Sequence, residues 1–139
     1  MLCSTIGSLN IVAVIAISII GFLLGGLWYS VLFGKAWLAE MKMTEETMKA
    51  AGGGGRKMIV TLLLTFVTVL TLATLESALG LRGVGHGAKL GACVGVGFVL
   101  TRVLTSAQYE GKSLKLVAIV GGYDLALLVV AGAILGVWR

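Results

Sequence analysis

Charged residues are scarce in this sequence of 139 residues. They make up 12% of the chain, against 58% for hydrophobic residues, and the mean hydropathy is +1.06. Soluble domains average roughly 45–50% apolar and about 25% charged residues. A chain with so little polar surface does not suit water as its main solvent, so the composition argues against a soluble protein and predicts an integral membrane protein.

Cysteine and histidine are also rare, which limits the chemistry available. Cys3 lies near the N-terminus and Cys93 inside an apolar run, so we expect two free thiols rather than a disulfide. The single histidine, His86, falls short of the three or more protein ligands that a metal site needs. The sequence contains no His-Glu-x-x-His pair, nucleophile elbow or Cys-x-x-Cys motif. We therefore expect no enzymatic activity and no cofactor or metal.

The hydrophobic residues fall into four long runs, at about 9–33, 58–80, 86–109 and 114–138. Each run is long enough to cross a ~30 Å hydrocarbon core as a helix, and isolated strands do not span bilayers. No basic segment precedes the first run, so we expect it to stay as the first span rather than act as a signal peptide. The sequence predicts one all-α domain over residues 1–139, a bundle of four transmembrane helices in two helical hairpins.

The segment 34–57, between the first two runs, has a different composition. It mixes lysines and glutamates with Trp37 and several methionines, which is typical of a short amphipathic segment on the membrane surface. Thr44 is the predicted N-cap of a helix that starts at Glu45. The four glycines at 52–55 should break that helix before the second span.

The basic residues favour one side of the predicted bundle. The segments after the first and third runs carry Lys35, Lys42, Lys49, Arg56, Lys57, Lys112 and Lys115, whereas the other side carries Arg82, Lys89 and Arg139. The positive-inside rule places both termini on the non-cytoplasmic side. The net charge of +5 suits anionic headgroups at the ends of the spans rather than nucleic acid. A bacterial plasma membrane and a eukaryotic organellar membrane both satisfy these constraints.

Glycines recur at four-residue intervals in three of the runs. They are Gly21 and Gly25 in the first run, Gly87, Gly91 and Gly95 in the third, and Gly132 and Gly136 in the fourth. Such ridges let helix backbones approach closely. Two uses stay open: packing of the spans within one chain, and association with a second copy or another membrane subunit.

Charged residues also occur inside the apolar runs. Asp124 lies about ten residues into the fourth run, roughly 15 Å deep, and Arg102 lies in the third run. A charge at this depth needs a partner, so we predict an Arg102–Asp124 ion pair. This pair is either a proton or ion relay or a staple that fixes the register of the last two spans. We also predict a polar cluster at the other membrane face, formed by Glu76, Arg82, His86 and Lys89.

The segment Gly26 to Trp37, GLWYSVLFGKAW, is followed by Met43-Thr44-Glu45-Glu46 and resembles the signature of the family of domain of unknown function 1761. Glu-Gly-Lys-Ser-Leu-Lys-Leu at 110–116 and Gly122-Tyr123 extend the resemblance over nearly the whole chain. The resemblance implies a small four-span membrane protein and assigns no activity, substrate or cofactor.

Within that signature, Trp28, Tyr29, Lys35 and Trp37 look like an interfacial anchor. Members of the family usually have proline where this sequence has Val31, and this chain contains no proline. We therefore expect the first helix to continue through the point where relatives turn.

These observations lead to two functional hypotheses. The first is a non-enzymatic multi-pass membrane protein that acts through helix–helix contacts, as a homo-oligomer or as an accessory subunit of a membrane complex. Its partners would then be the lipid bilayer and other membrane subunits or copies of itself. The alternative is a small transporter or channel with a proton or ion path near Asp124 and Arg102.

Overall fold

The computed structural model describes residues 2–138, and every regular element in this range is helical. The elements are α1 (Leu2–Gly7), α2 (Ile11–Leu27), η1 (Trp28–Leu32), α3 (Gly34–Glu40), α4 (Glu45–Ala51), α5 (Gly54–Ala78), α6 (Val84–Val94), η2 (Gly95–Leu100), α7 (Thr101–Glu110) and α8 (Leu114–Leu135). The stretches long and apolar enough to cross a membrane are Ile11–Leu32, Gly54–Ala78, Val84–Glu110 and Leu114–Leu135. The predicted all-α bundle of four membrane-spanning helices is confirmed.

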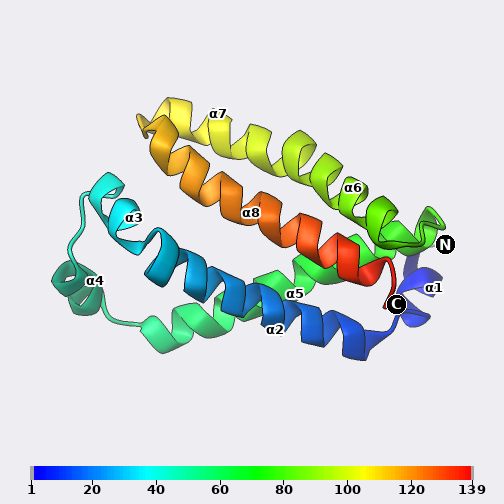
Figure 1. The fold of residues 1–139 in the computed structure, drawn as a ribbon. Helices are drawn as coiled ribbons and strands as arrows, with labels where there is room; N and C mark the ends of the chain where they lie inside the picture. The colour runs from blue at the N-terminus through cyan, green and yellow to red at the C-terminus, as the bar shows by residue number, and fades with distance from the viewer. Residues whose placement is uncertain (1, 139) are drawn as a thin grey trace.

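The four spans pack around α8. Figure 1 shows α6 and α7 running antiparallel beside α8, while α2 lies along another side of α8 and α5 crosses behind α2. Helix α8 contacts every other span. A residue on α8 is therefore in the best position to join the first and second halves of the chain.

Different elements gather at the two ends of the bundle. Helix α1, the α5–α6 turn and the C-terminal end of α8 gather at one end, and α3, α4 and the α7–α8 turn gather at the other (Figure 1). The backbone N–H of Gly83 donates a 2.8 Å hydrogen bond to the carbonyl of Gly136, which ties the α5–α6 turn to the end of α8.

The segment between the first two spans contains two short helices, α3 and α4. Helix α4 begins at Glu45 as predicted, because the Thr44 hydroxyl oxygen accepts a 3.1 Å hydrogen bond from the backbone N–H of Thr47. Acidic residues occupy its first turn and Lys49 its last, which suits the helix dipole.

The glycine run breaks the chain over fewer residues than the sequence predicts. Gly52 and Gly53 have positive φ angles of 66° and 69° and form the break, but Gly54 and Gly55 already belong to α5. Once two glycines have reversed the chain, the next two extend the long helix, and the Gly53 carbonyl accepts from the Lys57 N–H. The second span therefore starts earlier than Met58.

The core lies where α2, α5 and α8 cross. Its fully buried side chains include Ala13, Val14 and Ile17 of α2, Val69, Leu72 and Ala73 of α5, and Leu128, Ala131 and Leu135 of α8. Spacings of three and four residues place each set on one helix face. The outer faces are exposed isoleucine, leucine and valine, which suits contact with lipid.

The first span ends in a π-helical turn. The helical path continues past α2 through Val31, as expected without proline, but it widens into η1, where the Phe33 N–H donates to the Trp28 carbonyl at 2.9 Å. Phe33 then leaves the helical region with φ −127°. The next residue is Gly34, and a side chain would not fit at this position, because a Cβ there would lie 2.9 Å from the Tyr29 carbonyl oxygen.

Candidate functional site

An aromatic cluster joins the end of the first span to the middle of the last. We use this name for Trp28, Tyr29, Phe33, Trp37 and Tyr123. The extra residue in a π-helical turn changes the direction of neighbouring side chains, and such turns are frequent at functional sites. Here the consecutive residues Trp28 and Tyr29 both reach α8: their ring centroids lie 6.4 Å and 5.4 Å from that of Tyr123.

Two side-chain hydrogen bonds fix the cluster between α2 and α8. The indole Nε1–H of Trp28 donates to the carbonyl of Ile119 at 2.9 Å, and the hydroxyl of Tyr123 donates to the carbonyl of Gly21 at 2.9 Å. Both donors are therefore satisfied within the apolar bundle, where an unsatisfied polar group would be costly.

Small residues make room for the aromatic rings. A Cβ at Gly25 would lie 2.9 Å from the Tyr123 hydroxyl oxygen, and one at Gly122 would lie 3.3 Å from Cζ2 of Trp28. Both distances are too short for an undisturbed contact at these sites. The glycines beside the aromatic residues are thus part of the same packing unit.

Asp124 lies at the edge of this cluster. It is half-buried on α8, directly follows Tyr123 in the chain, and its carboxyl lies in the neighbourhood of the Tyr29 and Tyr123 phenols. The cluster therefore combines two phenols and a carboxyl group between the first and last spans.

The predicted Arg102–Asp124 ion pair is not formed. Lys112 and Glu110 form a salt bridge at 3.6 Å, whereas Arg102 lines a groove with Trp37 and Val120. The register explains this: a Cβ on Gly121 would contact Cδ1 of Leu100 at 2.7 Å, so Arg102 lies level with the residues before Gly121. Asp124 is then about five residues, or ~7.5 Å, further along α8.

The predicted interfacial anchor divides into two parts. Trp28, Tyr29 and Trp37 are half-buried in the aromatic cluster, where the Tyr29 and Trp37 rings meet edge to face at 5.7 Å. Lys35 is exposed. The aromatic residues of this segment thus pack against protein, and Lys35 is left to face the surroundings.

The seven ridge glycines all face neighbours within the chain. A Cβ on Gly87 or Gly91 would collide with the carbonyls of Gly132 and Leu128, respectively, and Gly95 lies against Leu125. Gly132 and Gly136 face the carbonyls of Gly87 and Gly83 in return, while Gly21 and Gly25 meet Leu127 and Tyr123. The backbones of α6 and α8 are therefore in direct contact.

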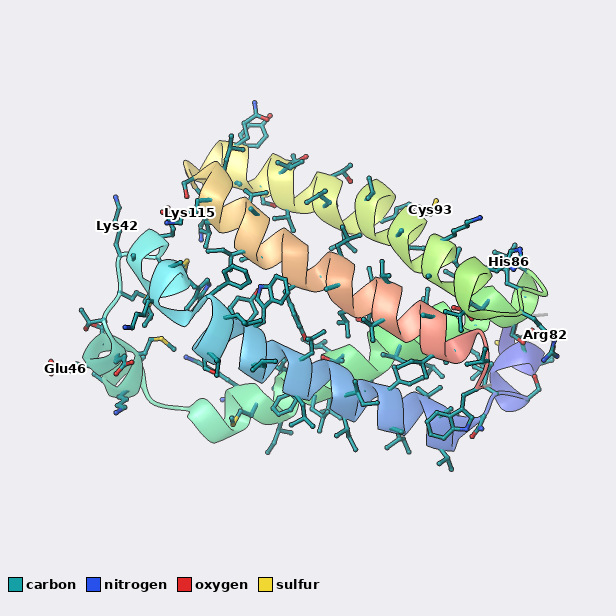
Figure 2. All side chains as sticks on the ribbon, in the orientation of Figure 1. Lys42, Glu46, Arg82, His86, Cys93 and Lys115 are labelled. Carbon is teal, nitrogen blue, oxygen red and sulfur yellow. The ribbon has the colours of Figure 1, made fainter. Side chains whose placement is uncertain are left out.

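The predicted polar cluster at the opposite end is divided. Arg82, His86 and Lys89 are exposed, and Figure 2 shows Arg82 and His86 at the outer edge of that end. Glu76 is fully buried, with 0% of its surface exposed, and its Oε1 would lie 3.1 Å from a Cβ on Gly87. The sequence signal for this burial is the spacing from Val69, Leu72 and Ala73, which places Glu76 on the core face of α5.

No metal-binding arrangement occurs within residues 2–138, where no three histidine, cysteine, aspartate or glutamate side chains gather. Cys3 and Cys93 are both free and exposed.

Four apolar spans, a pair of short helices between the first two spans and an aromatic cluster between the first and last spans define a small multi-pass α-helical membrane protein. The family model described as protein of unknown function (DUF1761) matches residues 12–136, and the chain belongs to this family. The matched range includes the whole aromatic cluster and all seven ridge glycines. Comparison with curated proteins and with solved structures gives no match.

Proposed function

We propose that this protein is a non-enzymatic membrane protein that acts through helix–helix contacts, as a homo-oligomer or as an accessory subunit of a larger membrane complex. The supporting observation is a stripe of small and polar residues on the outer face of the third span. Cys93, Gly97, Thr101 and Gln108 are exposed there, and Thr105 is half-exposed. We call these residues the outer stripe.

The outer stripe is distinct from the glycine ridge on the same span. Cys93 and Gly97 each lie two residues from a ridge glycine, so they point away from α8. A Cβ added to Gly97 would meet nothing within 4 Å. The ridge is thus used within the chain, whereas the outer stripe leaves backbone available to another helix.

The composition of the stripe favours a protein neighbour over lipid. Elsewhere the exposed faces carry large apolar residues such as Ile59, Leu63 and Val67. Small residues with four-residue spacing permit close helix association in a bilayer, and polar side chains add hydrogen bonds across it. The Thr101 hydroxyl already donates to the Gly97 carbonyl at 2.9 Å and the Thr105 hydroxyl to the Thr101 carbonyl at 2.8 Å, so both hydroxyls of the stripe stay satisfied when it associates.

Cysteine cross-linking in native membranes tests this proposal. With Cys3→Ser as background, oxidation should link two copies through Cys93 if the stripe joins identical chains. Gly97→Leu should abolish the link, and Gly26→Leu should not, because Gly26 is equally open but lies on α2. The mass of the complex in native nanodiscs, with co-purifying proteins identified, distinguishes a homo-oligomer from an accessory subunit. A monomer unaffected by Gly97→Leu would contradict the proposal.

A second candidate, a small proton or ion transporter, is favoured by the carboxyl of Asp124 beside the phenols of Tyr29 and Tyr123. Flux through proteoliposomes should then be lost in Asp124→Asn and retained in Glu110→Gln, a carboxyl change at the surface turn. Equal flux in the wild type, both variants and empty vesicles would exclude it.

A further inference from the structure

A groove lies at the end of the bundle that carries α3. It encloses about 370 Å³ between α3, α7 and the first turns of α8. Its walls include Trp37 from α3 and Met41 directly after α3, Val103 and Ala107 from α7, and Val117 and Val120 from α8. The groove is therefore mainly apolar, and it is open to the outside of the bundle.

Two polar contacts hold α3 over the start of α8. The hydroxyl of Ser113 donates to the carboxylate of Glu40, and the Lys112 ammonium lies 3.8 Å from the Met41 sulfur. These links connect α3 to the α7–α8 turn. The two sides of the groove are therefore held together.

The groove contains a cation that no group within residues 2–138 neutralises. Among the charged residues that line the groove, Glu110 forms a salt bridge with Lys112 at 3.6 Å and not with Arg102. Arg102 is exposed, and among residues 2–138 it forms neither a hydrogen bond nor a salt bridge. It lies eight residues before Glu110, about 12 Å along the helix from the end of the span. A guanidinium at such a position needs an anionic partner or water.

We propose that this groove binds one anionic phospholipid, with the phosphodiester against Arg102 and an acyl chain along the apolar walls. The guanidinium group offers paired donors that match two phosphate oxygens, and its side chain is long enough to reach towards the headgroup level. Lys42 and Lys115 lie at the same end of the bundle (Figure 2), where they attract anionic headgroups. Charge complementarity thus selects an anionic lipid rather than a zwitterionic one.

Lipid retention measured by native mass spectrometry tests the headgroup contact. The protein is reconstituted with equal amounts of phosphatidylglycerol and phosphatidylcholine, extracted in mild detergent and examined for bound lipid. The wild type should keep one phosphatidylglycerol, and Arg102→Gln should weaken retention about tenfold, the loss expected for one charge-assisted contact. Arg82→Gln, an exposed arginine at the opposite end, should behave as wild type. Equal retention in the three proteins, or equal retention of both lipids by the wild type, would overturn the proposal.

A groove-filling variant tests the acyl-chain contact separately. Ala107 is 7% exposed and lines the groove, so Ala107→Phe should expel the lipid although Arg102 is unchanged. Ala118→Phe adds the same ring to an exposed position of α8 and should keep the lipid. Lipid retained by a folded Ala107→Phe protein would overturn the acyl-chain part. If that variant does not fold, as judged by circular dichroism, Val103→Phe, which places the ring in the same groove from a half-buried position, decides the acyl-chain part in its place.

Discussion

The hydroxyl of Tyr123 on the last span donates a 2.9 Å hydrogen bond to the backbone carbonyl of Gly21 on the first. Trp28 on the first span donates in the opposite direction, to the carbonyl of Ile119 on the last. Each bond limits sliding of α2 along α8, and their separation along both helices limits rotation. The two bonds together fix the depth of one half of the chain relative to the other.

Tyr123→Phe should destabilise the bundle by about 0.6–1.5 kcal/mol, because it removes one buried hydrogen bond and keeps the ring packing. The measurement is the free energy of unfolding in mixed micelles as denaturing detergent is added. Tyr109→Phe serves as the control, since Tyr109 is 86% exposed and should show no change. Equal effects in both variants would show that the Tyr123–Gly21 bond adds nothing to stability.

Two glycines on the third span should respond in opposite ways to the same substitution. Gly91→Ala places a methyl group against the Leu128 backbone and should cost about 1–3 kcal/mol by separating α6 from α8. Gly97→Ala meets open space and should be neutral or stabilising by up to ~1 kcal/mol in the isolated chain, since alanine favours helix. Unfolding of the two purified variants in the same micelles checks this. A destabilised Gly97→Ala would contradict the packing of this span.

The spans and the α4 cap were predictable because they depend on local sequence. Hydrocarbon thickness sets the length of a spanning run, and Thr44 before two glutamates is a helix start whatever surrounds it. The aromatic cluster was not predictable in the same way. The π-helical turn Trp28–Leu32 has no proline and one serine, which does not distinguish it from an ordinary helix, so Trp28 and Tyr29 suggest an interface until Tyr123 is placed beside them.

The failure of the Arg102–Asp124 prediction has a different cause. Depth counted along each apolar run places the two charges at different levels that a long arginine side chain could bridge, but the real register follows from backbone contact between the ridge glycines of α6 and α8. That contact sets Leu100 against Gly121, and Asp124 then lies more than a turn away from Arg102. Register in a glycine-packed hairpin is a tertiary property, and a one-chain sequence pattern does not contain it.

Ser113 has two contacts that substitutions can separate. Its hydroxyl oxygen accepts from the Leu116 N–H at 3.2 Å as the N-cap of α8, and its hydroxyl hydrogen is directed to Glu40 on α3. Ser113→Ala should speed amide exchange about fivefold in both α3 and the first turn of α8, as expected for the loss of ~1 kcal/mol. Ser113→Asp keeps a capping oxygen but repels Glu40, so only α3 should exchange faster.

Hydrogen exchange read by mass spectrometry resolves the two segments, and Thr61→Ala, exposed on α5, is the control. Unchanged exchange of α3 in both variants would show that Glu40 does not hold this helix.

A double-mutant cycle separates the two charges of the last hairpin. Arg102→Gln and Asp124→Asn should change the free energy of unfolding independently, with a coupling below about 0.5 kcal/mol, because the structure leaves them unpaired. Tyr29→Ala and Tyr123→Ala should instead be coupled, since their rings meet edge to face across the first and last spans with centroids 5.4 Å apart. Both cycles are measured in the same micelles, so the second one controls for the sensitivity of the first. A coupling of 1 kcal/mol or more between Arg102 and Asp124 would mean that the ion pair forms in the membrane after all. Arg102 would then have Asp124 as its partner, and this result would contradict the proposal that it binds a phospholipid phosphate.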